Sequence, residues 1–158
     1  MNKINFKAIL TSLIILTMST AHAGYNITRM TTIVDDFSGS YTVTKSGRID
    51  EHVFSGTSIT EFTNFHPFPT KDEASLSGTL SKVIDINDGL STSSDAQLTV
   101  SNADDTLNIS FSDLIYEISE GVVTITGEVT ANEETYDAAD LPPRLSKLLK
   151  RIFYLTRK

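Results

Sequence analysis

Hydrophobic and polar residues alternate along most of the chain, and the alternation is clearest between Leu107 and Tyr136. A period of two is typical of a β-strand with one buried face. The dipeptide Glu120-Gly121 divides this segment into two strands, and a two-residue loop that ends in glycine suits a tight hairpin. The sequence therefore predicts a hairpin with these facing pairs: Ile118 with Val123, Tyr116 with Ile125, Leu114 with Gly127, and Ser112 with Val129.

The same alternation continues upstream and predicts further strands. On the first hairpin strand the apolar positions change parity near Ser112-Asp113, which predicts a β-bulge. Pro67 and Pro69 predict a loop, because proline cannot donate to a strand ladder. Other breaks are expected at Ser46-Gly47, Ser55-Gly56 and Asn87-Asp88-Gly89. Residues 90–95 are expected to form either a loop or a ragged start to the next strand. The upstream strands are predicted at residues 24–34, 37–45, 49–54, 59–65, 76–86 and 96–101.

This pattern predicts an all-β fold class, because no helical periodicity precedes residue 140. About eight strands joined by short turns favour a single antiparallel meander. We expect the meander to close as a small barrel, since closure removes exposed strand edges. A two-sheet sandwich is the alternative. One short C-terminal amphipathic helix follows the strands.

The N-terminus has the layout of a bacterial secretory signal peptide. Lys3 and Lys7 precede an apolar run, 8–18, and a small-residue segment that ends in Ala21-His22-Ala23. The apolar run is too short to span a bilayer as a helix, so cleavage after Ala23 is favoured over a membrane anchor. The predicted regions are a cleaved signal (1–23), a β-domain (24–139), and a Pro-Pro linker with a basic helix (140–158). The mature protein is expected in the periplasm or the medium.

Charge is distributed unevenly along the mature chain. Residues 24–143 carry five basic and all twenty acidic residues, a net charge of −15, whereas residues 144–158 carry +6. An acidic body disfavours nucleic acid as a partner, because phosphates would be repelled. The chain contains no cysteine, which excludes thiol catalysis, disulfides and cysteine-bound zinc.

The C-terminal segment predicts an amphipathic basic helix. Its apolar residues recur at helical spacing, with Asp140 expected near the N-cap and the two prolines in the first turn. Such a short helix needs a surface to lie on. That surface is the protein's own acidic body, an anionic membrane, or a partner's groove. The predicted contact residues are Arg144, Leu145, Lys147, Leu148, Leu149, Lys150, Arg151, Ile152 and Phe153.

Few residues suggest other chemistry. His52 and His66 lack metal-ligand spacing and are read as structural, so neither a metal nor a cofactor is predicted. No nucleophile or phosphate-loop motif is present, and no catalytic residue is predicted. The aromatic residues around the proline loop form a possible ligand rim: Phe62, Phe65 and Phe68.

The sequence thus favours an exported, non-enzymatic β-domain that acts by binding a basic protein or an apolar ligand. The first alternative is a peripheral protein held to anionic lipid by the basic helix. The second, weaker alternative is a hydrolase that works through two carboxylates.

Overall fold

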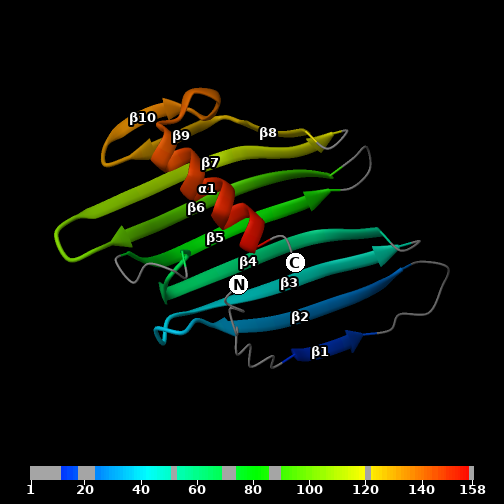
Figure 1. Cartoon of the computed structure of the whole chain (residues 1–158). Helices are drawn as coiled ribbons and strands as arrows, with labels where there is room; N and C mark the ends of the chain where they lie inside the picture. Colours follow the sequence, from blue (N-terminus) through cyan, green and yellow to red (C-terminus); the bar gives the residue numbers. More distant parts are fainter. Residues whose placement is uncertain are drawn as a thin grey trace, which may run out of the picture.

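The structure, a computed structural model, describes residues 12–17, 24–50, 53–68, 74–85, 90–119 and 122–156. In this part of the chain one antiparallel sheet carries an α-helix across one of its faces (Figure 1). The strands are β1 (Ser12–Thr17), β2 (Tyr25–Val34), β3 (Ser40–Asp50), β4 (Val53–Phe65), β5 (Ser75–Asp85), β6 (Leu90–Ser101), β7 (Thr106–Ser119), β8 (Val122–Thr126), β9 (Glu128–Ala131) and β10 (Glu134–Asp137). A 3₁₀ turn, η1 (Ala138–Asp140), leads into helix α1 (Pro143–Leu155).

The sheet is a meander in which each strand from β1 to β7 pairs with the next one along the chain. Strand β7 then pairs with both β8 and β9, and β9 pairs with β10. This confirms the predicted all-β antiparallel meander with one C-terminal helix. The barrel and the sandwich are not observed, because the described strands form one open sheet. Helix α1 covers the apolar face that closure would otherwise bury.

The predicted hairpin has the correct register close to its loop, which itself lies outside the described residues: Ile118 faces Val123 and Tyr116 faces Ile125. Gly127 also lies against Leu114, as predicted, but the pair predicted farthest from the loop, Ser112 with Val129, is wrong. Gly127, with φ at +121°, separates β8 from β9. Beyond it the pairing changes, so that Ile109 faces Ala131 and Ser110 faces Thr130.

The β-bulge predicted at Ser112-Asp113 is confirmed. Both residues lie between the pairs Ser94–Leu114 and Ala96–Phe111, opposite the single residue Asp95 of β6. The Asp95 carboxylate accepts hydrogen bonds from Ser112 Oγ (3.1 Å) and from the Asp113 amide (2.9 Å). The extra residue in β7 is what directs both Phe111 and Leu114 toward α1.

Two predicted breaks are wrong, because they lie inside strands. The turns predicted at Ser46-Gly47 and Ser55-Gly56 fall within β3 and β4, where Gly47 faces Gly56. A Cβ atom on Gly47 would stand 2.2 Å from the Ser55 carbonyl oxygen and 2.8 Å from the Phe54 ring, so this glycine allows the backbone of β4 to approach closely. Residues 90–95 form the first part of β6, which agrees with the alternative that they start the next strand rather than with a loop. Residues 87–89 lie outside the described residues.

The core lies between α1 and one face of the sheet, here called the covered face. This face consists of alternate positions on β2 to β7, whose register places them on one side. Phe153 of α1 stacks on Tyr116, with ring centroids 5.0 Å apart. The largest fully buried side chains include Phe65, Leu76, Leu80, Ile109, Leu114, Leu149 and Ile152. The opposite side is called the outer face.

Both ends of the sheet bear on the sequence predictions. Strand β1 lies within the predicted signal peptide and pairs with β2. Cleavage after Ala23 stays a prediction, and it would leave β2 as the sheet edge.

At the C-terminal end of the sheet, Asp140 belongs to η1, which is capped by Asp137. Helix α1 starts at Pro143 without a side-chain cap. Proline in the first helical turn agrees with the prediction, since its missing N–H has no helical partner there.

Candidate functional site

The apolar contact residues predicted at the C-terminus belong to α1, and all of them are buried: Leu145, Leu148, Leu149, Ile152 and Phe153. Of the three surfaces considered for this helix, the structure places it on the protein's own sheet. The packing is apolar rather than electrostatic, because no ion pair joins α1 to the sheet among the described residues. Each fully buried side chain of this size contributes roughly 1.5–3 kcal/mol, whereas an exposed ion pair contributes ~0–1 kcal/mol.

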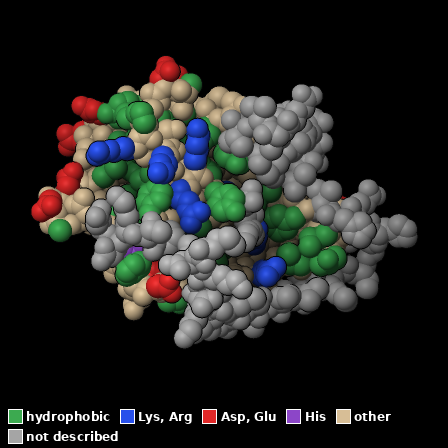
Figure 2. All heavy atoms as spheres, in the orientation of Figure 1, with side chains coloured by type: hydrophobic (Ala, Val, Ile, Leu, Met, Phe, Trp, Pro, Cys, Tyr) green, Lys and Arg blue, Asp and Glu red, His purple; other side chains and the backbone are tan. Residues whose placement is uncertain are grey.

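The basic residues of α1 lie on its other side and form the basic helix surface, which consists of Arg144, Lys147, Lys150 and Arg151. The first three are exposed. Arg151 is partly buried, and its Nε donates to the Pro67 carbonyl oxygen at 3.0 Å. In the described part of the chain none of the four pairs with a carboxylate. Figure 2 shows Lys and Arg side chains gathered along the helix, whereas Asp and Glu lie mainly toward one edge.

The aromatic residues predicted as a ligand rim take part in the core instead. Phe62 and Phe65 are buried. Tyr41 contacts both rings, with centroids 5.8 Å from Phe62 and 4.8 Å from Phe65. Phe68 is partly buried against the same cluster, and Lys147 Nζ lies 5.7 Å from its ring centroid. Only Phe68 therefore adjoins an exposed basic residue, and it joins the proline loop to the basic helix surface.

Sequence reasoning missed a group of cations on the covered face. The register aligns Arg29 of β2 with Lys45 of β3, and Lys45 with Ser58 of β4. Ser58 in turn faces Lys82 of β5, and Lys82 faces Ser94 of β6. We call Arg29, Lys45 and Lys82 the cation row. One indication of this group was present in the sequence: Lys82 is the one charged residue among the alternate positions of its strand that are otherwise apolar or glycine.

The cation row becomes more buried from the sheet edge inward. Arg29 is exposed, Lys45 is intermediate, and Lys82 is 5% exposed. Burial and the nearby Lys45 lower the pKa of Lys82 to about 7, and burial and the nearby Arg29 lower the pKa of Lys45. Lys82 Nζ donates to Thr156 Oγ1 just past the end of α1 and lies 5.2 Å from the Phe153 ring centroid. A lysine in this place also interacts favourably with the helix C-terminus.

His66 has a structural role, as its position next to a proline predicted. Its Nδ1 lies 3.0 Å from Asp35 Oδ2, and its amide donates to the same oxygen. Asp35 also accepts from the amides of Phe37 and Gly39 at the β2–β3 turn. Burial alone would raise the pKa of Asp35, but these hydrogen bonds outweigh burial and lower it. The pair ties the β2–β3 turn to the loop after β4.

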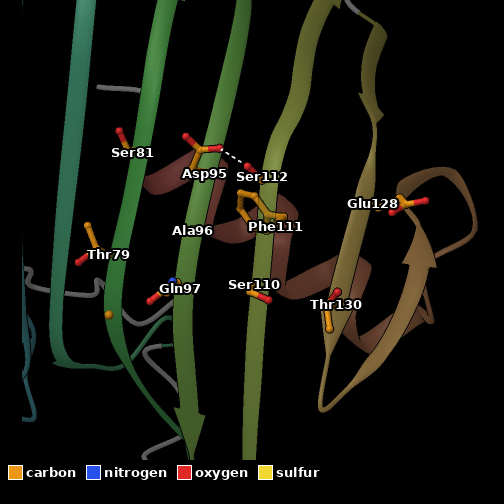
Figure 3. A pocket seen from close by; sticks show the side chains of 11 residues that line it. Thr79, Ser81, Asp95, Ala96, Gln97, Ser110, Phe111, Ser112, Glu128 and Thr130 are labelled. Atoms are coloured by element: carbon orange, nitrogen blue, oxygen red, sulfur yellow. Dashed lines mark hydrogen bonds between the residues drawn. The ribbon is translucent and has the colours of Figure 1, made fainter.

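A shallow polar groove lies on the outer face, on the side of the sheet away from α1 (Figure 3). Thr79, Gln97, Ser110 and Thr130 line it from β5, β6, β7 and β9. Asp95 also lines this groove, but its carboxylate is occupied in holding the bulge. Besides hydroxyl and amide groups, the groove has a second carboxylate, that of Glu128, and no basic residue lines it.

The described residues contain no cluster of three histidine or acidic side chains arranged to hold a metal ion. His52 lies outside the part of the chain that the structure describes. No helix of residues 12–17, 24–50, 53–68, 74–85, 90–119 and 122–156 has the length and apolar character needed to cross a bilayer.

Comparison of the chain with protein-family models, with curated proteins and with solved structures gives no match. The functional proposals below therefore depend on the geometry and chemistry of the site.

Proposed function

We propose that this protein acts by binding rather than by catalysis, and that the basic helix surface attaches it to an anionic membrane surface. The observation that carries the proposal is the exposed group of cations on α1. Arg144, Lys147 and Lys150 project from one helix with no carboxylate partner among the described residues. In a chain whose body carries −15, leaving these cations unpaired keeps them available for an anionic surface.

The proposed attachment is electrostatic, because the apolar stripe of α1 is committed to the core. Each Lys or Arg close to an anionic lipid surface contributes up to ~1 kcal/mol, and salt weakens that contribution within a Debye length of about 10 Å. The three exposed cations, Arg144, Lys147 and Lys150, therefore support reversible binding that is sensitive to salt. The acidic residues of the body oppose it, which favours an orientation with α1 toward the lipid.

The other functions predicted from the sequence receive less support. An apolar ligand would need free apolar surface, but the α1 stripe and the Phe62–Phe65 cluster are filled by core contacts. A hydrolase would need two free carboxylates facing one site. Asp95 and Glu128 both line the outer-face groove, but Oδ1 of Asp95 is engaged by the bulge. A basic protein partner remains compatible with the acidic body, but no described residues form a specific site for it.

The test is cosedimentation of the mature chain with phosphatidylglycerol vesicles at low salt. We expect binding to these vesicles, none to phosphatidylcholine vesicles, and release by salt. Lys150→Glu should weaken binding about fivefold or more, because it replaces an attraction by a repulsion. Arg48→Glu is the matched control, since it makes the same charge change on the outer face. Equal weakening by both substitutions would show that net charge, rather than the basic helix surface, governs binding.

A further inference from the structure

A cluster of buried hydroxyl groups adjoins the cation row. Ser58, Thr60 and Ser94 are 1%, 0% and 1% exposed, and all three point to the covered face. Their hydroxyl oxygens have no hydrogen-bond partner within the described residues. Burying a hydroxyl group without a hydrogen-bond partner is unfavourable, so three such groups in one place need an explanation.

These hydroxyls lie among the cations rather than apart from them. Ser58 stands directly between Lys45 and Lys82, and Ser94 faces Lys82 from its other side. Side chains that face each other on adjacent strands have Cβ atoms about 4.5–5.5 Å apart. Thr60 is two residues from Ser58 on the same side of β4. The cluster is therefore a continuous strip of ammonium and hydroxyl donors.

No anionic residue shares the covered face of these strands with the strip. The covered-face positions of β2 to β7 include no Asp or Glu, although the body contains twenty acidic residues. Three of the five basic residues in the body belong to the cation row. Gathering like charges and burying one of them is costly without an opposite charge. A structural role alone would be served by a single capping lysine at the end of α1.

We propose that Lys82, Lys45, Ser58 and Ser94 form a binding site for a small oxyanion, which enters from the β2 side along Arg29. Ammonium and hydroxyl groups donate to carboxylate and phosphate oxygens, and hydrogen bonds to charged acceptors are the stronger kind. The oxyanion is either free or the acidic head of an amphiphile. In the second case its chain would extend along the β2 side of the row, where Tyr25 and Ile27 lie on the covered face without being buried.

This site is independent of the basic helix surface, since the two lie on opposite sides of α1. The charged groups near Lys82 are Lys45 and, beyond it, Arg29; the neighbouring strands and α1 present hydroxyls and the Phe153 ring. A bound anion would favour the protonated form of Lys82. Binding near pH 7.5 should therefore take up protons from the buffer and weaken as the pH rises.

Calorimetric titration of the mature chain with inorganic phosphate and, separately, with decanoate tests the proposal. Each titration is repeated in two buffers of different ionisation enthalpy, which counts the protons taken up. We expect at least one probe to bind, with proton uptake, and to bind at least tenfold more weakly to Lys82→Met and Lys45→Met. Arg48→Met, on the outer face, should leave binding unchanged.

The two probes identify the source of the oxyanion: binding of phosphate indicates a free anion, and binding of decanoate alone indicates an amphiphile. Lys45 is only partly buried, so Lys45→Met keeps the test valid if Lys82→Met fails to fold. The proposal is overturned if neither probe binds. It is also overturned if both folded variants bind as well as the parent chain.

Discussion

The two faces of the sheet are built from alternate residues of the same strands, yet they differ in nearly every property. The covered face is mainly apolar, includes no acidic position on β2 to β7, and carries the cation row. The outer face is rich in Ser and Thr, bears acidic residues such as Glu61 and Glu117, and exposes isolated apolar side chains. Only one face needs a cover, and α1 supplies it. Polar residues on the covered face are therefore exceptions that need a reason.

The largest expected contrast between the faces is in stability. Leu149 is fully buried where α1 meets the sheet, whereas Ile59 is exposed on the outer face. Leu149→Ala should lower the free energy of unfolding by about 2–5 kcal/mol, because it removes buried methyl groups and leaves a cavity. Ile59→Ala should change it by less than about 1 kcal/mol. Urea unfolding of both variants measures the difference, and similar losses would contradict the assignment of the faces.

The next largest effect on stability is expected at Lys82, a charged residue on the mainly apolar covered face. Lys82→Met should stabilise the chain by about 1–4 kcal/mol at neutral pH, because it removes a buried charge and keeps most of the packing. The pKa of Lys82 is about 7 in the folded chain and 10.5 in the unfolded chain, so the unfolded state binds more protons between these values. The stability of the parent chain should therefore rise as the pH increases from about 7 toward 10.5.

The Lys82→Met variant should lack this rise in stability with pH. Its free energy of unfolding should therefore exceed that of the parent chain most below pH 7, and the difference should shrink toward pH 10.5. Denaturant unfolding at several pH values measures the gap between the two chains. A constant gap across this range would contradict a depressed Lys82 pKa in the folded chain.

A smaller effect is expected at the β2–β3 turn, beside the aromatic cluster. Asp35→Asn should lower stability at pH 7 by about 1–3 kcal/mol, since a buried carboxylate accepts bonds from three amides and from His66. The folded pKa of Asp35 is depressed below 3.8, so this contribution is present above pH 3.8 and is lost as the pH falls through the folded value. Asp36→Asn, at the exposed neighbour, is the control. Equal losses in both variants at pH 7 would show that the turn does not depend on Asp35.

Much of the fold could be predicted from local pattern. Period-two alternation identified the meander, and the parity change at Ser112-Asp113 located the bulge correctly. The breaks expected at Gly47 and Gly56 were wrong, because these glycines face each other on β3 and β4 and let the two backbones approach closely. The open sheet was not predicted either. The pattern shows that one face is apolar, but not whether a helix or the sheet itself covers it.

The candidate sites were predictable only in part. The helical spacing of the C-terminal segment separated its apolar residues from its cations. The cation row could not be found from the sequence, since Arg29, Lys45 and Lys82 are far apart in the chain. Only the strand register brings them into line. Only Lys82 could be noticed in the sequence, because it interrupts a series of apolar residues at alternate positions of its strand.

The division of α1 into a buried stripe and an outward basic side is tested most directly by thiol accessibility. The chain has no native cysteine, so Leu149→Cys and Lys150→Cys each introduce a single thiol at adjacent positions. Both are labelled with a water-soluble maleimide, with and without phosphatidylglycerol vesicles. We predict that the thiol at position 149 stays unreactive in both conditions, whereas the thiol at position 150 reacts in solution and is protected by vesicles. Rapid reaction at position 149 in folded protein without vesicles would contradict the account.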